Sequence, residues 1–458
     1  MHIQDLVELD GLHLVHPVSN FREHQKKGVK LLKSGQGPWI KDANGTEYLD
    51  GFAGLWCVNL GYGQQRVVDA ATKQMEELPY ATGYFGFGSE PATLLAKKLV
   101  DITPASLQHV YFSLGGSDAV DSALRYITHY YNAIGKPTKK HIISLQRGYH
   151  GSSCTGAGIT GLPVFHKNFD VPTPLQHHIS CPYLYRSDFE SADALIEASV
   201  KELENKVNSI GVDNVAAFFC EPVIGSGGVI VPPKGWLKAI SETCKRLGIL
   251  FLADEVITGF GRTGTMFACE HENIQPDLMT LAKGLTSGYA PMGALLMSDE
   301  IFNGIADGPN KAAVVGHGQT YSAHPVSAAV ALETIKIYEE SLLANAQEVG
   351  PYFESKLKGF LTHPLVGDVR CQGLLGSIEL VANKATKRQF PTELKLFETI
   401  DKIAWKNKLI FRTFGDNILG FAPALCFTKA EFDILFERLT LILDEVLTLD
   451  CVQQEMKK

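Results

Sequence analysis

From residue 64 onward the sequence alternates short apolar segments with longer amphipathic ones, and this alternation restricts the fold more than any other feature. Apolar runs such as Val215–Cys220 and Leu278–Leu281 have the length and residue types of buried strands. The segments between them, such as Gly235–Arg246, have helical periodicity. Strands that are buried on both faces and separated by helices form mainly parallel sheets covered on both sides. We therefore predict an α/β fold with a mainly parallel sheet.

The pattern differs at the two ends of the chain. Near the N-terminus, Asn44-Gly45 separates the runs Trp39–Lys41 and Thr46–Leu49, which indicates a β-hairpin. After Pro325, short strands mix with helices, which is typical of a smaller α+β domain. We expect three parts: an N-terminal arm and hairpin packing with the small domain (1–60), a large domain (61–325) and the C-terminal small domain (326–458).

Within the expected small domain, the pattern predicts three helices and four short strands. The last helix covers Lys429–Leu447, and the first two strands cover Val369–Cys371 and Leu375–Leu380. A long helix follows Pro325 and extends to about Ser341, and a second helix covers Thr392–Asn407. Apolar runs predict single strands over Leu409–Phe414 and Ile418–Phe421.

Composition excludes several classes of protein. The 458 residues carry a net charge of −8 and no block of positive charge, so a nucleic acid has no evident binding surface. The nine cysteines include no C-x-x-C pair, which favours reduced thiols in the cytoplasm over a disulfide framework or a zinc site. The N-terminal residues lack the pattern of a signal peptide, and no apolar run approaches the roughly 20 residues of a membrane helix. We expect a cytoplasmic protein with no membrane partner.

One segment carries most of the chemical information. The apolar run Leu250–Ala253 delivers Asp254 and Glu255 to its carboxyl end, and the run Leu278–Ala282 delivers Lys283 twenty-nine residues after Asp254. Open α/β sheets bind ligands at the carboxyl ends of their strands. A lysine at such a site is partly desolvated, which lowers its pKa and makes its amine nucleophilic. A carboxylate beside an activated lysine is the pair that a pyridoxal phosphate site requires.

The spacing of these residues and the glycines of Gly259-Phe260-Gly261-Arg262-Thr263-Gly264 closely resemble the signature of class III aminotransferases. This family has the pyridoxal-phosphate fold type I and includes ω-amino acid and amine:pyruvate transaminases. The resemblance extends from the hairpin to the final helices. It implies pyridoxal 5′-phosphate as the cofactor, Lys283 as the lysine that forms a Schiff base with it, and Asp254 as the partner of its pyridinium nitrogen. Val256 is expected to pack against one face of the ring.

Further cofactor contacts are expected outside this segment. Gly116 and Ser117 open a helix after the strand Val110–Ser113, and exposed backbone N–H groups at a helix N-terminus suit a phosphate. The resemblance implies that the ring of Tyr149, in a Tyr-His-Gly motif, stacks on the cofactor. It also implies that Thr320 reaches the phosphate of a neighbouring subunit, so that the active unit is a homodimer or a dimer of dimers.

We expect substrate contacts from residues that match the pocket of ω-transaminases. Arg412 matches a movable arginine that binds the acceptor carboxylate, because a guanidinium binds carboxylates through two parallel contacts. Trp56 matches an aromatic wall of the pocket, and Phe85 is expected to add aromatic surface, along with Tyr149. Glu221, which follows the strand Val215–Cys220, is expected near the ring without an assigned role. Aromatic walls favour apolar or aliphatic amines.

The expected reaction is a ping-pong transamination. The nitrogen of a primary amine or ω-amino acid passes to the cofactor and then to pyruvate, which gives an aldehyde or ketone and L-alanine. Two alternatives from the same family remain open: a 2-oxoglutarate-dependent ornithine or 4-aminobutyrate transaminase, and an aminomutase. A cofactor-binding protein that has lost catalysis is a third, although intact Lys283 and Asp254 argue against it.

Two other signals are rejected. The segment 156–161 matches the G-x-G-x-x-G pattern of dinucleotide-binding sites, but Leu162-Pro163 follows where a helix should begin. A nicotinamide dehydrogenase is therefore not expected. His317 and His324 suggest a metal site, but no acidic or cysteine partners cluster near them in the sequence, so no metal is expected there.

Overall fold

A seven-stranded sheet forms the centre of the molecule in the computed structural model, which describes residues 2–458; Met1, the first residue of the expected N-terminal arm, lies outside them. Six strands are parallel, and β10 runs antiparallel to both of its neighbours. In spatial order the strands are β4 (His109–Ser113), β10 (Gly293–Met297), β9 (Leu278–Leu281), β8 (Leu250–Asp254), β7 (Val215–Cys220), β5 (His141–Leu145) and β6 (Gln176–Ile179). The predicted α/β fold with a mainly parallel sheet is confirmed.

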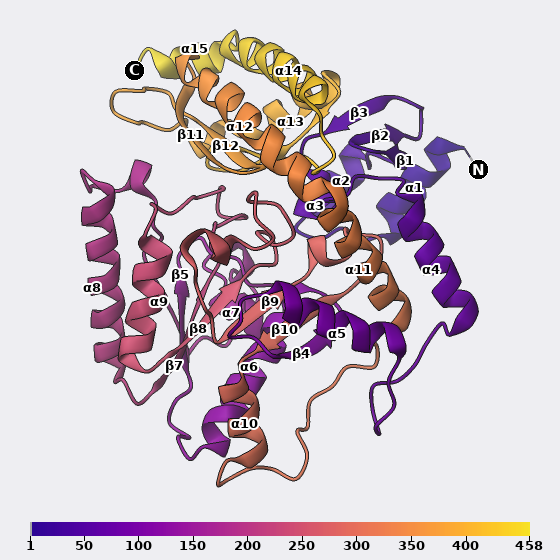
Figure 1. The fold of residues 1–458 in the computed structure, drawn as a ribbon. Coiled ribbons are helices and arrows are strands. Elements are labelled where there is room, and N and C mark those ends of the chain that lie inside the picture. Colours follow the sequence, from indigo (N-terminus) through magenta and orange to yellow (C-terminus); the bar gives the residue numbers. More distant parts are fainter. Residues whose placement is uncertain (1) are drawn as a thin grey trace.

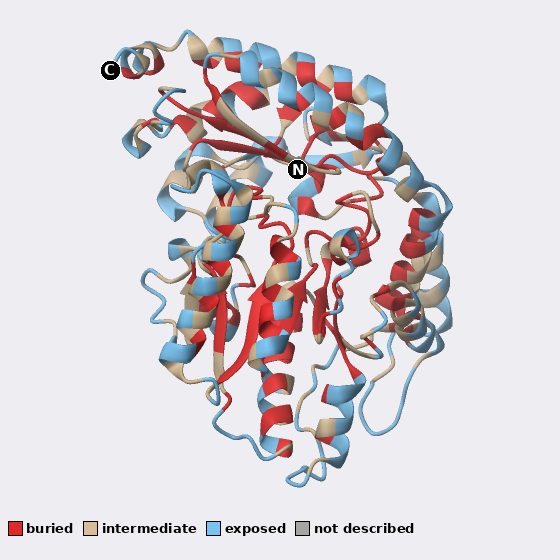
Figure 2. Ribbon diagram, turned by 60° about the vertical axis from the view of Figure 1, so that its left-hand side comes forward, coloured by how far each residue is buried: buried red, intermediate tan, exposed pale blue. Residues whose placement is uncertain are grey.

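Helices cover both faces of this sheet, as the burial pattern in Figure 2 shows. Alternate strand residues belong to opposite faces: Phe218 and Cys220 of β7 lie in one apolar cluster with residues of α8 (Ala192–Ile210) and α9 (Trp236–Leu247), whereas Ala217 and Phe219 lie in another with residues of α6 (Gly116–Ala133) and α10 (Asp299–Asp307). The helices of this part of the chain are α4 (Gln65–Glu77), α5 (Glu90–Ile102), α6 (Gly116–Ala133), α7 (Cys154–Ile159), α8 (Ala192–Ile210), α9 (Trp236–Leu247), α10 (Asp299–Asp307) and α11 (Pro325–Ile337).

The N-terminal hairpin lies beside the C-terminal part of the chain (Figure 1). Its four-stranded sheet has the order β1-β2-β3-β13, and β3 pairs in parallel with β13 (Leu409–Ile410), more than three hundred residues later. Gly45 makes the turn between β2 and β3 with a φ of +86°, a conformation that favours glycine. The elements before the large sheet are α1 (Ile3–His13), α2 (Phe21–Lys27), β1 (Leu32–Gln36), β2 (Trp39–Asp42), β3 (Glu47–Asp50) and α3 (Ala53–Trp56).

The C-terminal part forms a third sheet, which is antiparallel and has the order β11-β12-β15-β14. Helices α12 and α14 lie above it in Figure 1. Its elements are α12 (Leu343–Gly359), β11 (Val366–Gln372), β12 (Leu375–Leu380), α13 (Leu396–Lys406), β13 (Leu409–Ile410), β14 (Arg412–Thr413), β15 (Ile418–Phe421), α14 (Lys429–Leu447) and α15 (Asp450–Met456). Across residues 2–458, no helix is both long enough and apolar enough to span a bilayer.

Three predicted elements differ from the structure. The single strand expected over Leu409–Phe414 is two strands in different sheets, because β13 pairs with β3 whereas β14 pairs with β15. The helix expected from Thr392 begins at Leu396, since Lys395 adopts a left-handed backbone with a φ of +45°. The helix after Pro325 does not end near Ser341: it passes through a wider π turn over Tyr338–Leu342 and continues as α12.

Candidate active site

The carboxyl ends of five parallel strands meet at one edge of the large sheet, and a pocket opens there. The strands β4, β5, β7, β8 and β9 each deliver side chains to it within a few residues of their ends. The pocket is lined by Gly116, Ser117, Val120, Tyr149, His150, Gly151, Glu221, Asp254, Val256, Ile257 and Lys283. Six residues that the sequence predicted as site residues, Gly116, Ser117, Tyr149, Asp254, Val256 and Lys283, therefore line one pocket.

Asp254 ends β8 and is almost completely buried beside His150. The Nδ1 atom of His150 lies 2.7 Å from the Oδ2 atom of Asp254, and the backbone N–H of Val256 donates to Oδ1 at 3.2 Å. Burial disfavours a charged His150, but the hydrogen bond and charge of Asp254, together with the charge of Glu221, outweigh it and raise the His150 pKa. An imidazole that holds its proton keeps the Asp254 carboxylate oriented at the pocket floor.

Glu221 follows β7 and holds the loop that carries Tyr149. Its Oε1 atom accepts a hydrogen bond from the backbone N–H of Tyr149 at 2.8 Å, and Oε2 accepts one from Gly225 at 3.0 Å. Burial is the main influence on this carboxyl group, and with the nearby charge of Asp254 it raises the pKa of Glu221 to about 7. Glu221, which lines the pocket, therefore changes charge near neutral pH.

Lys283 follows β9, and its side-chain amine makes no hydrogen bond or ion pair with any residue from 2 to 458. Burial lowers the pKa of its amine, which increases the nucleophilic neutral fraction. Its backbone is left-handed, with a φ of +45°, which is unusual for a lysine. The buried Tyr338 hydroxyl stabilises this turn by donating to the Gly284 carbonyl at 2.7 Å.

The start of helix α6 forms another part of the pocket wall. Gly116 and Ser117 are its first two residues, so their backbone N–H groups have no partner within the helix. A side chain at Gly116 would place its Cβ 3.1 Å from Val256 Cγ1, and one at Gly151 would lie 2.8 Å from Ser117 Oγ. These two glycines keep space for an anion next to a helix N-terminus.

Two predicted substrate residues lie near the pocket but not in its wall. Trp56 is buried in an apolar cluster with Phe414 and Ile257, and Ile257 also lines the pocket. Arg412 lies on β14, and its guanidinium carbon is 5.4 Å from the ring centre of Phe414. Arg412 is exposed as a whole, but partial desolvation lowers its pKa from the ordinary value.

The other two predicted residues, Phe85 and Thr320, lie outside the pocket in this single chain. Phe85 is 90% exposed, and Thr320 is also exposed. Their loops contact each other, since the Tyr80 hydroxyl donates to the Thr320 carbonyl at 2.9 Å. Both assignments stay predictions, and for Thr320 the prediction itself concerns a neighbouring subunit.

Like Glu221, His150 has no role that the sequence alone assigns. It stands between Tyr149 and Gly151, and only the fold shows that it is the buried partner of Asp254. The available signal is the position of this histidine in a Tyr-His-Gly motif shortly after the predicted strand His141–Leu145. The segment 156–161 lies largely in helix α7, which begins at Cys154, so it does not form the strand–turn–helix of a dinucleotide site. The Nε2 atom of His317 contacts the Ser122 hydroxyl at 2.9 Å.

Comparison with known proteins agrees with the geometry of this site. The family model described as "Aminotransferase class-III" matches residues 22–443. The chain belongs to the class III aminotransferases. It is therefore an aminotransferase enzyme, and its cofactor is pyridoxal 5′-phosphate.

Relatives of this aminotransferase have several different substrates in their names. It is 40% identical over 436 residues to the putrescine–pyruvate aminotransferase of Pseudomonas aeruginosa, with 94% of each chain covered. It is 37% identical over 446 residues to the diaminobutyrate–2-oxoglutarate transaminase of Halomonas elongata, with 95% of each chain covered. The solved structure of an ω-transaminase from Pseudomonas jessenii in complex with PMP has a TM-score of 0.94 and 38% identity, covering 96% of this chain and 98% of that one.

The residues of the pocket fit pyridoxal phosphate. The space kept by Gly116 and Gly151 at the start of α6 suits its phosphate, and the unpartnered Lys283 amine suits its aldehyde carbon. Asp254 offers a carboxylate for the pyridinium nitrogen, and Val256 and Tyr149 also line the space. These are the roles that the resemblance assigns, and the structure provides a pocket in which they are compatible.

Proposed function

We propose that this aminotransferase moves an amino group from a primary amine or ω-amino acid to pyruvate, giving an aldehyde or ketone and L-alanine by a ping-pong reaction. The choice of pyruvate as the acceptor rests on one observation. In residues 2–458, every arginine except Arg412 donates a hydrogen bond to another residue or forms an ion pair. A single unengaged guanidinium suits an acceptor with a single carboxylate.

The surroundings of Arg412 support its use for two different substrates. Its neighbour Phe414 shares an apolar cluster with Trp56 and Ile257, so the guanidinium stands at the border of an apolar surface. Because no carboxylate pairs with it among the described residues, its side chain is free to change conformation. In this arrangement an apolar amine packs against the aromatic side chains, and the carboxylate of a keto acid binds the Arg412 guanidinium.

The chain's own residues account for the proton transfers. When bound, pyridoxal phosphate withdraws electrons from the amine-bearing carbon of the substrate. Lys283 has a lowered pKa and a free amine, so it can take a proton from that carbon and return it. Asp254, oriented by His150, places a carboxylate at the floor of the pocket. Gly116, Ser117 and Thr320 would hold the phosphate, Thr320 from a second subunit.

We propose a homodimer, or a dimer of dimers, as the active assembly, and the cytoplasm as its location. The exposure of Phe85 and Thr320 in the single chain supports a second copy at this face. The nine cysteines are unpaired in the described chain, which supports a reducing compartment.

A spectroscopic half-reaction tests the proposed acceptor. The visible absorption band of the bound cofactor is recorded, and amines, ω-amino acids or L-alanine are added without an acceptor. The band should disappear with a suitable amine and return with pyruvate but not with 2-oxoglutarate. Return with 2-oxoglutarate alone would assign the enzyme to the ornithine or 4-aminobutyrate group. An aminomutase would complete its reaction with no acceptor.

The variant Arg412→Leu tests the residue that carries this proposal. Loss of a charge-assisted bidentate contact, worth about 1.5–3 kcal/mol, should slow the pyruvate half-reaction by about 10- to 100-fold. The half-reaction with an apolar amine should change by less than about threefold, because that substrate does not use the charge. Arg246→Leu, which removes a surface pair with Glu204, is the matched control. Equal losses in both half-reactions would show that Arg412 has a structural role.

A further inference from the structure

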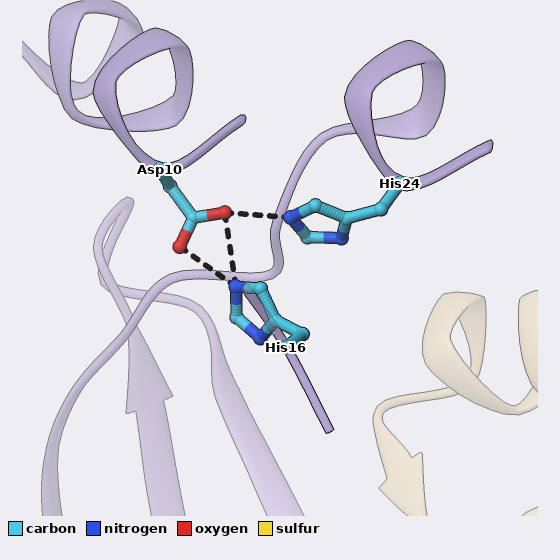
Figure 3. A group of neighbouring side chains, drawn as sticks. All are labelled: Asp10, His16 and His24. Atoms are coloured by element: carbon cyan, nitrogen blue, oxygen red, sulfur yellow. Dashed lines mark hydrogen bonds and ion pairs between the residues drawn. The ribbon is translucent and has the colours of Figure 1, made fainter. Parts of the chain in front are cut away.

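Three potential metal ligands converge in the N-terminal segment, far along the chain from the residues that line the active-site pocket. Asp10 comes from α1, His24 from α2, and His16 from the loop between them (Figure 3). The Nε2 atom of His24 lies 2.7 Å from Asp10 Oδ1, and the Nε2 atom of His16 lies 2.9 Å from Asp10 Oδ2. All three ligand atoms lie within 4.8 Å of one another. Figure 3 shows both imidazole rings directed at the same carboxylate.

These ligand types favour a particular kind of ion. Two imidazole nitrogens and one carboxylate oxygen suit Zn²⁺ and related transition metals, whereas Mg²⁺ and Ca²⁺ prefer oxygen ligands only. The Nδ1 atoms of His16 and His24 make no hydrogen bond with other residues between 2 and 458. Each ring can therefore carry its proton on Nδ1, which leaves Nε2 free to bind a metal.

The backbone around the cluster is already held in place. The Ser19 hydroxyl donates to the His16 carbonyl at 2.7 Å, and the Gln25 side chain donates to the Gly11 carbonyl at 3.0 Å. The Asp10 side chain is only 9% exposed, against 29% for His16 and 18% for His24. A hollow lined by residues between Gly11 and Gln25, including both histidines, lies next to the cluster. Water can enter there and supply a fourth ligand.

The segment that contains the cluster has little else to hold it. Neither α1 nor α2 contains a fully buried residue, so burial of apolar side chains contributes little to their association. The contacts of this segment with α13 include the exposed ion pairs Lys27–Glu398 and Lys30–Asp401, and exposed pairs of this kind contribute little. A metal that binds only the folded arrangement would stabilise it directly.

We propose that Asp10, His16 and His24 bind one divalent transition-metal ion, with Zn²⁺ as the best fit, and that this ion fastens α1 to α2. The ion is structural and has no part in amino transfer. It stabilises the N-terminal segment against which α13 of the small domain packs.

Titration of the cofactor-loaded enzyme with Zn²⁺ tests this site. The protein is first treated with EDTA and dialysed, and binding is followed by calorimetry in the wild type and in His24→Gln and Asp10→Asn. The wild type should bind one more equivalent of Zn²⁺ per chain than either variant, or bind it at least about 10-fold more tightly. Zn²⁺ should also raise the Tm of the wild type and leave that of the variants unchanged.

His109→Gln is the matched control. His109 contacts Asp299 at 2.8 Å on the surface, but no second histidine joins that pair, so its loss should leave the Zn²⁺ equivalent intact. The visible band of the bound cofactor shows that each variant is folded. If one of the two ligand variants does not fold, the other still tests the site. The same number of Zn²⁺ equivalents with the same affinity in wild type, His24→Gln and Asp10→Asn would overturn the proposal. So would a bound equivalent that disappears only when cysteines are blocked.

Discussion

Asp254, His150 and Glu221 form a buried cluster in which one imidazole interacts with two carboxyl groups. His150 bonds directly to Asp254, and its charge also lowers the pKa of Glu221, although burial still raises that pKa to about 7. The two acids thus have different environments, since one has a histidine partner and the other accepts only backbone hydrogen bonds. Glu221, which accepts only backbone hydrogen bonds, therefore changes charge near neutral pH.

Glu221 should make the stability of the enzyme depend on pH in a predictable direction. In the unfolded chain this carboxyl group ionises near 4.5, but in the native state it stays protonated up to about 7. Between these values the unfolded state binds fewer protons, so the contribution of Glu221 to stability falls as pH rises. In Glu221→Gln this dependence is absent, and one of the two backbone hydrogen bonds is lost at every pH.

The measurement is the free energy of unfolding in urea for wild type and Glu221→Gln, at pH 5 and pH 8. The advantage of the wild type should be larger at pH 5 and should shrink by up to about 3 kcal/mol at pH 8. Glu204→Gln, which removes a surface carboxylate paired with Arg246, is the control. A constant or growing advantage of the wild type would show that Glu221 is charged in the native state across this range.

At the scale of elements, the fully buried strands of the central sheet were predictable, whereas the polar strand β6 and the pairing of strands across the chain were not. The apolar runs Val215–Cys220 and Leu278–Leu281 match β7 and β9 residue for residue, because strands buried on both faces have a strong signature in the sequence. The division of Leu409–Phe414 between two sheets depends on the partner β3, which no local pattern reveals. Likewise, the motif around Tyr149 was visible in the sequence, but the contact of His150 with Asp254 spans 104 residues.

The turn that follows β9 determines where Lys283 points, and it is tightly packed. A Cβ atom at Gly284 would lie 2.7 Å from Asn59 Nδ2 and 3.0 Å from the Cβ of Phe260. Gly284→Ala should therefore lower the free energy of unfolding by about 1–3 kcal/mol through overpacking, and it should weaken cofactor binding by moving Lys283. Thermal unfolding and the visible band measure the two effects.

Gly359→Ala is the matched control for this substitution. Gly359 ends helix α12 with helical backbone angles, and a Cβ atom there would meet nothing within 4 Å. Its replacement should be neutral or should stabilise the protein by up to about 1 kcal/mol. If Gly284→Ala changed the free energy of unfolding no more than Gly359→Ala does, the turn after β9 would accommodate the extra methyl group and the overpacking argument would be wrong.

For the molecule as a whole, we propose the division into residues 1–60, 61–325 and 326–458, with the hairpin assigned to the C-terminal side. The pairing of β3 with β13 supports this division, because it joins the N-terminal sheet to a strand of the small domain. The active-site pocket itself is lined entirely from the middle part. Arg412 and Trp56 come from the two outer parts, so movement of those parts would adjust substrate contacts without disturbing the cofactor residues.

The surface formed by the loops around Phe85 and Thr320 leads to a prediction about assembly. Phe85, Phe87, Val314 and Tyr321 are all exposed on these two loops, the second of which joins α10 to α11 in Figure 1. Exposed apolar side chains gathered on neighbouring loops mark a protein interface. Because Thr320 is expected to reach a cofactor phosphate in the other subunit, loss of this interface should also reduce activity.

Phe85→Ser should therefore raise the dimer dissociation constant by at least about 10-fold, since a buried aromatic residue at an interface contributes about 2 kcal/mol or more. Sedimentation velocity across a range of protein concentrations measures this constant, and activity measured at the same concentrations should fall as monomer appears. Leu441→Ser removes an exposed apolar side chain from α14 of the small domain and should leave both quantities unchanged. A Phe85→Ser enzyme that stays dimeric while its activity falls would place Phe85 in the substrate pocket without a role in assembly. A fully active monomer would contradict the predicted contact of Thr320 with a neighbouring cofactor.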